Sequence, residues 1–409
     1  MNYINQKSKS SWGLCLLILL FIFSPVLSTQ ETAQPGALYV IVIVVPTVIM
    51  AIQKGLIQSR TINIFAILLF VEALLSSAVS EMASTRPGTY MKYLMLILFF
   101  ISVNSVVLTH GQLKFSLKAY LGLSIVLSVL ILLSVVFGYP HTASDYYQGR
   151  YSIGITGLYK NPNYLVSFYN ISFFVICYIL ATVKMKVRKK VVLYLLLIMF
   201  IVSSFFTGTR AALLVEFLII LSMAIVLARK HNLYRVIPLV VIAVIVLIHY
   251  SEGINDIVSA FLGNREAFGD EGRTRAWNLA IQYIKESPIL GCGHNSWYSI
   301  HGSSYLEWLH NVFLELFLDQ GLIGFVLFLC IMITGYKKTN KDDRLFLLLF
   351  LLFSSMPMYF QNGLYEVHFW RYIIINRLLM NISSSYGGGI NEFFRSAFGD
   401  KYAHQRIVK

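Results

Sequence analysis

The chain has 409 residues, of which 57% are hydrophobic and only 13% are charged. Soluble globular domains carry about 25% charged residues, so this composition excludes an ordinary soluble enzyme and indicates a protein embedded in a lipid bilayer. A formal net charge of +14 would suggest nucleic-acid binding in a soluble protein, but the sequence contains no RNA-recognition, zinc-finger or basic helix-turn-helix pattern.

The first 30 residues resemble a secretory signal, because Lys7 and Lys9 precede an apolar stretch from Leu14 to Phe23. That stretch is long enough to be a transmembrane span, and the Ser-Pro-Val-Leu-Ser that follows it is a poor cleavage site. We therefore expect a first helix that is retained in the mature protein.

Twelve stretches are apolar for about the 20 residues that a helix needs to cross a bilayer. We place them at 12–28, 36–53, 61–79, 90–109, 115–137, 163–182, 191–207, 211–228, 235–250, 309–335, 345–361 and 364–382. The sequence thus predicts an all-α polytopic membrane protein with a single membrane domain over 1–382 and a cytoplasmic tail over 383–409. A large outer loop, 251–308, separates spans nine and ten.

Alternate connections between the spans are rich in lysine and arginine, as are both ends of the chain. The larger set comprises Lys54, Arg60, Lys114, Lys118, Lys184, Lys186, Arg188, Lys189, Lys190, Arg229, Lys230, Arg235, Lys337, Lys338, Lys341, Arg344, Arg395, Lys401, Arg406 and Lys409. By the positive-inside rule, we expect this side to be cytoplasmic. The loops 138–162 and 251–308 then face outward, away from ATP and nucleotide sugars.

Three inward-running helices are expected to begin at the outer surface. Arg210 opens span eight, His310 opens span ten, and Asn161 caps span six ahead of Pro162. A helix amino terminus carries about half a positive charge and free N–H groups, which suits a phosphate ligand. It also disfavours an imidazolium, so His310 is expected to be neutral and able to accept a proton from a hydroxyl. The plainer alternative is an interfacial capping histidine.

A periodic set of residues follows His310. Leu314, Phe317, Gly321 and Gly324 continue from it in three- and four-residue steps, which predicts one face of a continuous helix. The two glycines are expected to let a neighbouring helix approach closely. This arrangement would aim the histidine into the bundle.

The outer loop contains one amphipathic pattern, with an apolar stripe at Trp277, Ala280, Ile281 and Ile284. Pro288 and a turn at Gly291 and Gly293 follow it. We expect a short helix over the mouth of the bundle, with Arg273 and Arg275 on its leading turn. The alternative is a membrane-surface helix whose arginines touch lipid head groups.

Other polar residues give weaker signals. Glu72 and Glu216 interrupt predicted spans and are expected to be paired structural groups, because unpaired charges in a bilayer are costly. Asp270 and Glu271 are expected to form a solvated turn rather than a metal site. The cysteines lack metal-ligand spacing and predict no disulfide framework; they are Cys15, Cys177, Cys292 and Cys330.

The stretch from His310 resembles a signature of the bacterial O-antigen ligase and O-antigen polymerase superfamily: histidine, a polar residue, nine residues, Gly321, two residues and Gly324. The run RAALL from Arg210 is similar to a second motif of that superfamily. Arg273, followed by Trp277 and ESPILGCG, resembles its loop segment. The NPN at 161–163 and the twelve-span layout with a large outer loop are also similar. The resemblance covers roughly residues 150–380.

This resemblance implies a metal-independent, inverting membrane glycosyltransferase that needs no cofactor. Its donor would be a glycan on undecaprenyl diphosphate, and its acceptor another glycan or lipid-linked sugar. It implies that His310 activates the acceptor hydroxyl and that Arg210 and Arg273 hold the diphosphate. Further substrate contacts are expected from Arg275, Arg150, Asn161 and Asn311.

The resemblance also implies a place in the cell and a set of alternatives. We expect a bacterial inner-membrane protein with its active site on the periplasmic or extracellular face. A flippase and a chain-length regulator are candidate partners, and nucleic acid is not. An O-antigen or capsular polysaccharide polymerase is favoured slightly over a ligase that transfers the chain to lipid A-core. A flippase or transporter of the same lipid-linked glycan is the alternative from another class, although no inverted repeat is visible.

Overall fold

The computed structural model describes residues 12–27, 37–54, 60–106, 108–137, 162–230, 268–301, 309–355, 365, 367–385 and 389–399. Within these ranges the regular structure is helical, and no β-strand occurs. The helices are α1 (Trp12–Leu27), α2 (Ala37–Gln53), α3 (Thr61–Val79), α4 (Pro87–Ser105), α5 (His110–Phe137), α6 (Pro162–Thr182), α7 (Val187–Thr207), α8 (Arg210–Lys230), α11 (Phe268–Glu286), α12 (Ser296–His301), α13 (Val312–Ile333), α14 (Arg344–Ser355), α15 (Val367–Ser385) and α16 (Gly389–Phe398).

Eleven of the twelve predicted spans coincide with a helix, mostly to within a few residues at each end. The ninth prediction, 235–250, lies outside the described residues. Five helices, α3, α5, α6, α7 and α13, are long and apolar enough to cross a membrane by themselves. The all-α polytopic membrane fold is therefore confirmed, while the count of twelve spans stays a prediction.

Helix boundaries follow from local sequence. Pro87 occupies the first turn of α4, where its missing N–H costs nothing. Thr109 and Gln112 form a reciprocal cap at the start of α5: the Thr109 N–H donates to Gln112 Oε1 at 2.9 Å, and the Gln112 N–H donates to Thr109 Oγ1 at 3.4 Å. Gly208 ends α7 in the left-handed conformation, at φ 58°, and lets the chain reverse into α8.

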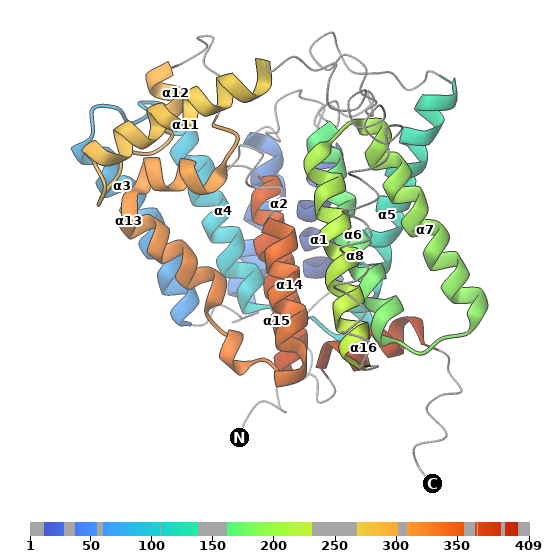
Figure 1. The fold of residues 1–409 in the computed structure, drawn as a ribbon. Coiled ribbons are helices and arrows are strands. Elements are labelled where there is room, and N and C mark those ends of the chain that lie inside the picture. Colours follow the sequence, from blue (N-terminus) through green and yellow to red (C-terminus); the bar gives the residue numbers. More distant parts are fainter. Residues whose placement is uncertain are drawn as a thin grey trace.

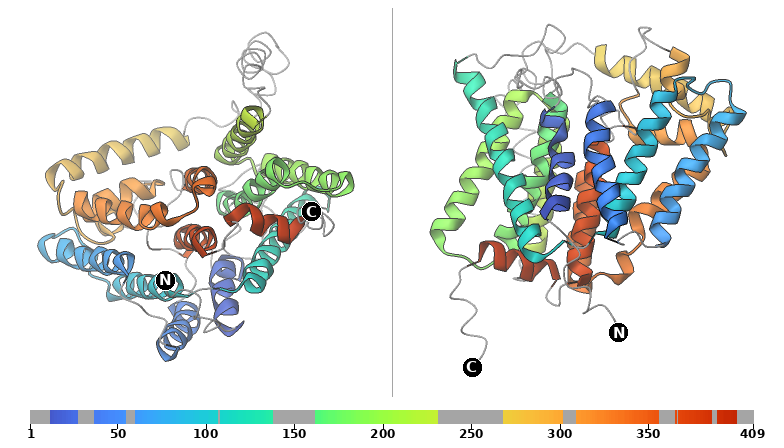
Figure 2. Two further views of the ribbon diagram at one scale, coloured as in Figure 1. Left: turned by 90° about the horizontal axis from the view of Figure 1, so that it is seen from below. Right: turned by 180° about the vertical axis from the view of Figure 1, so that it is seen from behind.

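The helices stand side by side in a single bundle (Figure 1). α3, α4 and α13 form one end of it and α5 to α8 the other, with α1, α14 and α15 between them (Figures 1 and 2). α1 packs against α2, α5 and α15. We call the side of the bundle that carries α11 and α12 the α11 face, and the opposite side, which carries α16, the α16 face (Figure 2).

The outer wall of the bundle is apolar. On α7 the exposed side chains include Val191, Val192, Leu195, Ile198 and Phe205. Soluble monomers rarely expose contiguous apolar patches of more than a few hundred Å², so a lipid-facing role explains this wall. α6, in contrast, is buried along nearly its whole length.

Small hydroxyl residues join the buried helices. The Ser172 Oγ of α6 donates to the Ser124 Oγ of α5 at 2.7 Å. The Ser128 and Ser203 hydroxyls, on α5 and α7, lie 2.5 Å apart. Serine lets helices approach closely and replaces hydrogen bonds that lipid cannot provide. These contacts set the spacing of α5, α6 and α7.

Part of the predicted tail is folded. α15 continues to Ser385, and α16 packs under the bundle through Phe393 and Phe394. The buried Asp343 holds the start of α16, because its Oδ2 accepts from the Ile390 N–H at 2.8 Å and from the Ser383 hydroxyl at 2.7 Å. The lysine-rich connections between α6 and α7 and between α13 and α14 lie on this same α16 face (Figure 1).

Candidate active site

α13 is broken at Gly321, whose φ of 58° and ψ of −160° are not helical. The expected continuous face from His310 through Leu314 and Phe317 to Gly324 is therefore wrong. The break turns the two halves of α13 relative to each other, and His310 precedes the helix. Gly321 contacts a loop rather than a neighbouring helix, as follows from the hydrogen bonds across the break.

The turn that follows α11 supplies acceptors for the second half of α13. The Leu322 N–H donates to the Pro288 carbonyl at 2.9 Å. The Ile323 N–H donates to the Ile289 carbonyl at 3.2 Å. These two carbonyls replace the acceptors that an unbroken helix would provide four residues earlier, at Leu318 and Asp319.

The same turn supplies donors for the first half of α13. The Cys292 N–H donates to the Leu318 carbonyl at 2.7 Å, and the Gly293 N–H donates to the Asp319 carbonyl at 3.0 Å. In an unbroken helix these two carbonyls would accept from N–H groups four residues later. Four hydrogen bonds to the turn thus replace two within the helix, and the buried backbone stays paired.

Glycines make this close approach possible. A Cβ on Gly291 would lie 2.6 Å from the Asp319 carbonyl group and from the Gln320 nitrogen. A Cβ on Gly321 would overlap the Ile289 carbonyl. Both glycines also have positive φ, 78° and 58°. The Gly-x-Gly turn and the glycine of the histidine motif, predicted separately, therefore meet in one contact.

The carboxylate of Asp319 holds the far end of the turn. It is fully buried, and its Oδ1 accepts from the Ser296 N–H at 3.0 Å and from the Ser296 hydroxyl at 2.6 Å. Its Oδ2 accepts from the Asn295 N–H at 2.8 Å and from the Tyr365 hydroxyl at 2.5 Å. Because Ser296 begins α12, the carboxylate binds the amino-terminal end of that helix.

α11 lies over the start of α13 (Figure 1). Its Ala276 and Ala280 are fully buried in a small apolar cluster that includes Leu318 and Leu309. The Trp277 indole N–H donates to the Leu309 carbonyl at 2.5 Å. The expected amphipathic helix is thus present, with its buried side on protein rather than on lipid. The bond from Trp277 ties it to the residue before His310.

His310 is half-buried and has a φ of 47°. Non-glycine residues rarely adopt this left-handed conformation, which costs about 1–3 kcal/mol and tends to occur at functional sites. Asn311 caps α13, since its side-chain oxygen accepts from the N–H groups of Phe313 at 3.1 Å and Leu314 at 3.0 Å. The histidine thus immediately precedes the cap rather than serving as the cap.

The predicted arginines lie on two helices of the same face. Arg210 is the first residue of α8, and Arg273 and Arg275 lie in the first two turns of α11. Arg275 is exposed. The side chains of Arg210 and Arg273, and all of Arg150 and Asn161, fall outside the described residues. α6, α8 and α13 all begin on the α11 face, as the sequence predicted (Figure 1).

The two predicted intramembrane acids have different surroundings. Glu216 of α8 is paired, because its Oε1 accepts from the Ser204 hydroxyl at 2.5 Å. Glu72 of α3 is buried, and neither of its oxygens has a hydrogen-bond partner among the described groups. The expected pairing is therefore confirmed for Glu216, whereas the part of the chain that the structure describes supplies no hydrogen-bond partner for Glu72. Glu72 lies beside α13, where a Cβ on Gly324 would be 3.1 Å from its Oε2.

His294 is a buried histidine that no sequence motif singled out. It lies in the turn after α11, and the centroid of its ring lies 4.1 Å from that of Tyr365, 4.4 Å from Tyr90 and 5.6 Å from Tyr93. Burial lowers the pKa of His294 to about 4, against a smaller opposing effect of the Thr89 backbone. The ring is therefore neutral at pH 7 and serves as packing.

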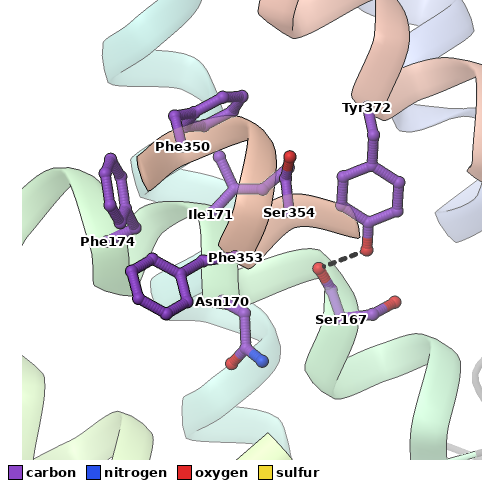
Figure 3. A pocket seen from close by; sticks show the side chains of 8 residues that line it. All are labelled: Ser167, Asn170, Ile171, Phe174, Phe350, Phe353, Ser354 and Tyr372. Carbon is purple, nitrogen blue, oxygen red and sulfur yellow. Dashed lines mark hydrogen bonds between the residues drawn. The ribbon is translucent and has the colours of Figure 1, made fainter. Parts of the chain in front are cut away.

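A small cavity lies elsewhere, between α6, α14 and α15 (Figure 3). Its lining residues are Ser167, Asn170, Ile171, Phe174, Phe350, Phe353, Ser354 and Tyr372. The Tyr372 hydroxyl donates to the Ser167 carbonyl at 2.7 Å and closes one side. The Asn170 amide is buried without a hydrogen-bond partner among the described groups. None of the residues predicted for the site lines this cavity.

The segment 192–329 matches a known family, that of the O-antigen ligase. The match begins in α7 and ends in α13, so it includes the start of α8, all of α11, the turn and the histidine segment. Over this segment, which is less than half of the chain, the protein is similar to the O-antigen ligase family. This finding confirms the resemblance that the sequence motifs indicated.

A curated relative supports the O-antigen ligase assignment over a shorter stretch. The exopolysaccharide production protein ExoQ of Rhizobium meliloti (strain 1021) is 30% identical over 113 residues. The alignment covers 23% of this chain and 25% of ExoQ. The chain therefore spans about a quarter of the length of the curated relative that it matches.

Proposed function

We propose that this protein is a membrane glycosyltransferase that moves a glycan from undecaprenyl diphosphate to an acceptor sugar hydroxyl at the α11 face. The observation that carries the proposal is the joining of α11 to α13 inside the family match. The turn after α11 completes the break in α13, and Trp277 bonds to the residue before His310. The basic end of α11 and the histidine therefore belong to one unit.

In the proposed reaction, His310 takes the proton of the acceptor hydroxyl. The acceptor oxygen then bonds to the anomeric carbon of the donor, and the bond from that carbon to the lipid diphosphate breaks with inversion. Arg210 and Arg273 stabilise the leaving diphosphate, whose charge suits forked guanidinium donors and helix amino termini. In this scheme no metal is needed to neutralise the leaving group.

Further contacts to the substrate are assigned to Arg275, Arg150, Asn161 and Asn311. Asn311 uses its side-chain oxygen as the helix cap, which leaves its amide N–H groups available to a sugar or phosphate oxygen. Arg275 is exposed on α11. The donor glycan, the acceptor and the membrane lipid are the proposed partners, with a flippase and a chain-length regulator as associated proteins.

The distribution of charge supports an outward-facing site. The described lysine-rich connections lie on the α16 face, which the positive-inside rule assigns to the cytoplasm. We therefore place the α11 face on the outer side of the bacterial inner membrane. Nucleotide sugars are absent there, so the donor has to carry its own leaving group, and a lipid diphosphate does so.

Between the two reactions of the superfamily, we favour polymerisation. ExoQ is an exopolysaccharide production protein by its name, which is closer to a polymerase than to a ligase of lipid A-core. Expression in strains that lack one activity or the other separates the two. Restored ladders of chain length indicate a polymerase, and capped core lipid indicates a ligase.

The proposal is tested with purified protein in vesicles that contain a lipid-diphosphate-linked glycan. His310→Ala should lower transfer about 10²–10⁴-fold, as expected for the loss of a general base. His110→Ala is the matched control, because His110 lies on the α16 face and its Nε2 is 2.8 Å from the Ser396 hydroxyl. Near-normal transfer by the His310 variant, folded like the control, would remove the assignment.

The phosphate role is tested with lysine replacements. Arg210→Lys and Arg273→Lys should both impair donor binding, since a lysine cannot make the paired contacts of a guanidinium to phosphate. Arg86→Lys is the control, because Arg86 lies near the α11 face over the Tyr298 ring, 5.0 Å from its centroid. Full activity of both test variants would contradict a bidentate phosphate role.

A further inference from the structure

We infer that Asp319 is a positioning residue for the proposed transfer reaction: through the turn, it sets where α11 lies relative to His310. This role rests on the proposed function, because it presumes a glycan transfer reaction; the link from Asp319 through the turn to α11 rests on the geometry. Asp319 belongs to none of the roles assigned above, and it is too deeply buried to touch substrate.

Hydrogen-bond donors surround the Asp319 carboxylate. All four hydrogen bonds to the Asp319 carboxylate come from outside α13: two from Ser296, one from Asn295 and one from Tyr365. Each oxygen accepts from one backbone N–H and one hydroxyl. This is a site for a carboxylate rather than for an amide of the same shape, because an amide nitrogen on either side would face a backbone N–H, which can only donate.

These bonds hold the turn after α11 in place. The segment from Pro288 to Ser296 is attached to α13 at both ends, by the backbone bonds across the Gly321 break and by the Asp319 carboxylate. The segment is also attached to α3, since the Ser80 hydroxyl donates to the Cys292 carbonyl at 2.6 Å. It therefore forms a fixed support at the carboxyl-terminal end of α11.

The length of α11 carries the position of the turn to the arginines. A helix of 19 residues is about 28 Å long at 1.5 Å per residue. Its carboxyl-terminal end is fixed by the turn, and Trp277 near its middle is fixed to Leu309. Arg273 lies one turn before Trp277, toward the amino-terminal end of α11. A small tilt at the support therefore displaces the arginine turn and pulls on the residue next to His310.

A second aspartate provides a matched control. Asp343 is also buried; its Oδ2 accepts from the Ile390 N–H at the start of the short helix α16 and from the Ser383 hydroxyl near the end of α15. Its bond to α16 places it on the α16 face, the side of the bundle opposite α11 (Figure 2). Asp319→Asn and Asp343→Asn thus make the same chemical change at two buried aspartates that bind helix ends. Asp319 accepts through both oxygens, whereas both bonds to Asp343 reach its Oδ2, which an asparagine oxygen can replace.

Cys292 reports on the support without any activity assay. It lies within the turn, is almost fully buried, and its thiol points toward the Tyr283 carbonyl at 3.7 Å. We expect Asp319→Asn to raise the rate of maleimide labelling at Cys292 about tenfold or more, measured by peptide mapping in membranes. Asp343→Asn should leave that rate unchanged.

Kinetics then separate positioning from mere stability. Per folded molecule, Asp319→Asn should raise the KM for the lipid-linked donor about 10- to 100-fold and lower kcat, because both the arginine turn and His310 are displaced. A purely structural loss would lower the amount of active protein and leave KM unchanged, as expected for Asp343→Asn. If Asp319→Asn does not fold, Tyr365→Phe removes one donor and should give the same changes in smaller measure.

Two results would overturn the inference. One is a folded Asp319 variant with Cys292 still protected and the donor KM unchanged. The other is an exposed Cys292 with normal KM and kcat, which would show a support without influence on the site. A wild-type protein that transfers no glycan would remove the proposed function, whereas the support would still be tested by labelling of Cys292.

Discussion

Gly321→Ala tests whether the break in α13 is built for the turn. The native φ of 58° and ψ of −160° lie in a region that is nearly restricted to glycine, and alanine there costs about 1–3 kcal/mol. The added Cβ would also overlap the Ile289 carbonyl, so the turn has to move away. That movement gives up four backbone hydrogen bonds, each worth about 0.5–1.5 kcal/mol net.

Together these effects predict a loss of roughly 3–9 kcal/mol if the turn is displaced completely. The control is Gly122→Ala in α5, where an added Cβ meets nothing within 4 Å. Alanine there should be neutral or stabilise by about 0.5–1 kcal/mol, because glycine weakens a helix interior. The two variants therefore make the same chemical change with opposite expected signs.

The assay is thermal unfolding in detergent, followed with a thiol-reactive dye, together with labelling of Cys292 at room temperature. We expect Gly321→Ala to melt several degrees below the wild type and to expose Cys292. Equal melting of the two glycine variants, with Cys292 protected in both, would refute the reasoning. It would mean that α13 straightens at no cost and that the turn does not depend on the break.

The other predictions concern titration beside the turn. Burial raises the pKa of the Cys292 thiol to about 11. The neutral thiol therefore stabilises the fold below about pH 8.5, and this contribution is lost as the pH rises toward 11. Folded protein at pH 8 should react with maleimide about 100-fold more slowly than unfolded protein. The pKa of His294 is lowered to about 4, so its contribution is present above about pH 6.5 and is lost as the pH falls toward 4, by up to about 3 kcal/mol. The melting temperature should therefore drop between pH 7 and pH 5, and His294→Phe, which keeps an aromatic ring among the tyrosines, should reduce that drop; an identical drop in the variant would contradict it.

Much of the fold could be predicted because the bilayer imposes a simple rule on sequence. Spans read from apolar length agree with α3 and α6 to within a residue at each end. The sharing of one face by the starts of α6, α8 and α13 followed from counting the spans and from the positive charges. These features depend on the average composition of long segments, which can be read from one sequence without knowledge of tertiary contacts.

The break in α13 could not be predicted in the same way. Its sequence has helical periodicity on both sides of Gly321, and a glycine in an apolar helix is usually a packing residue. What interrupts the helix is a backbone contact with Pro288 and Ile289, more than thirty residues away. Such a contact leaves no periodic signal, although the paired glycines of the two motifs were a hint of close approach.

Asp319 was missed for a different reason. Glu72 and Glu216 were noticed as acids within apolar spans, and Asp319 had the same property but lay inside the histidine motif. The role of the carboxylate depends on the Asn295 and Ser296 N–H groups and on the Tyr365 hydroxyl. Two of these residues occupy loops whose course no sequence pattern specified.

The exchange of backbone bonds between α13 and the turn restricts how the chain can be recombined with its relatives. A chimaera joined between residues 294 and 309 would take the turn from one parent and the broken helix from the other. Its junction would then depend on whether both parents share the same register across the break. Pieces cut before α11 and after α13 keep the mutual bonds within a single parent, and so define the smallest unit that can be transplanted between members of the superfamily.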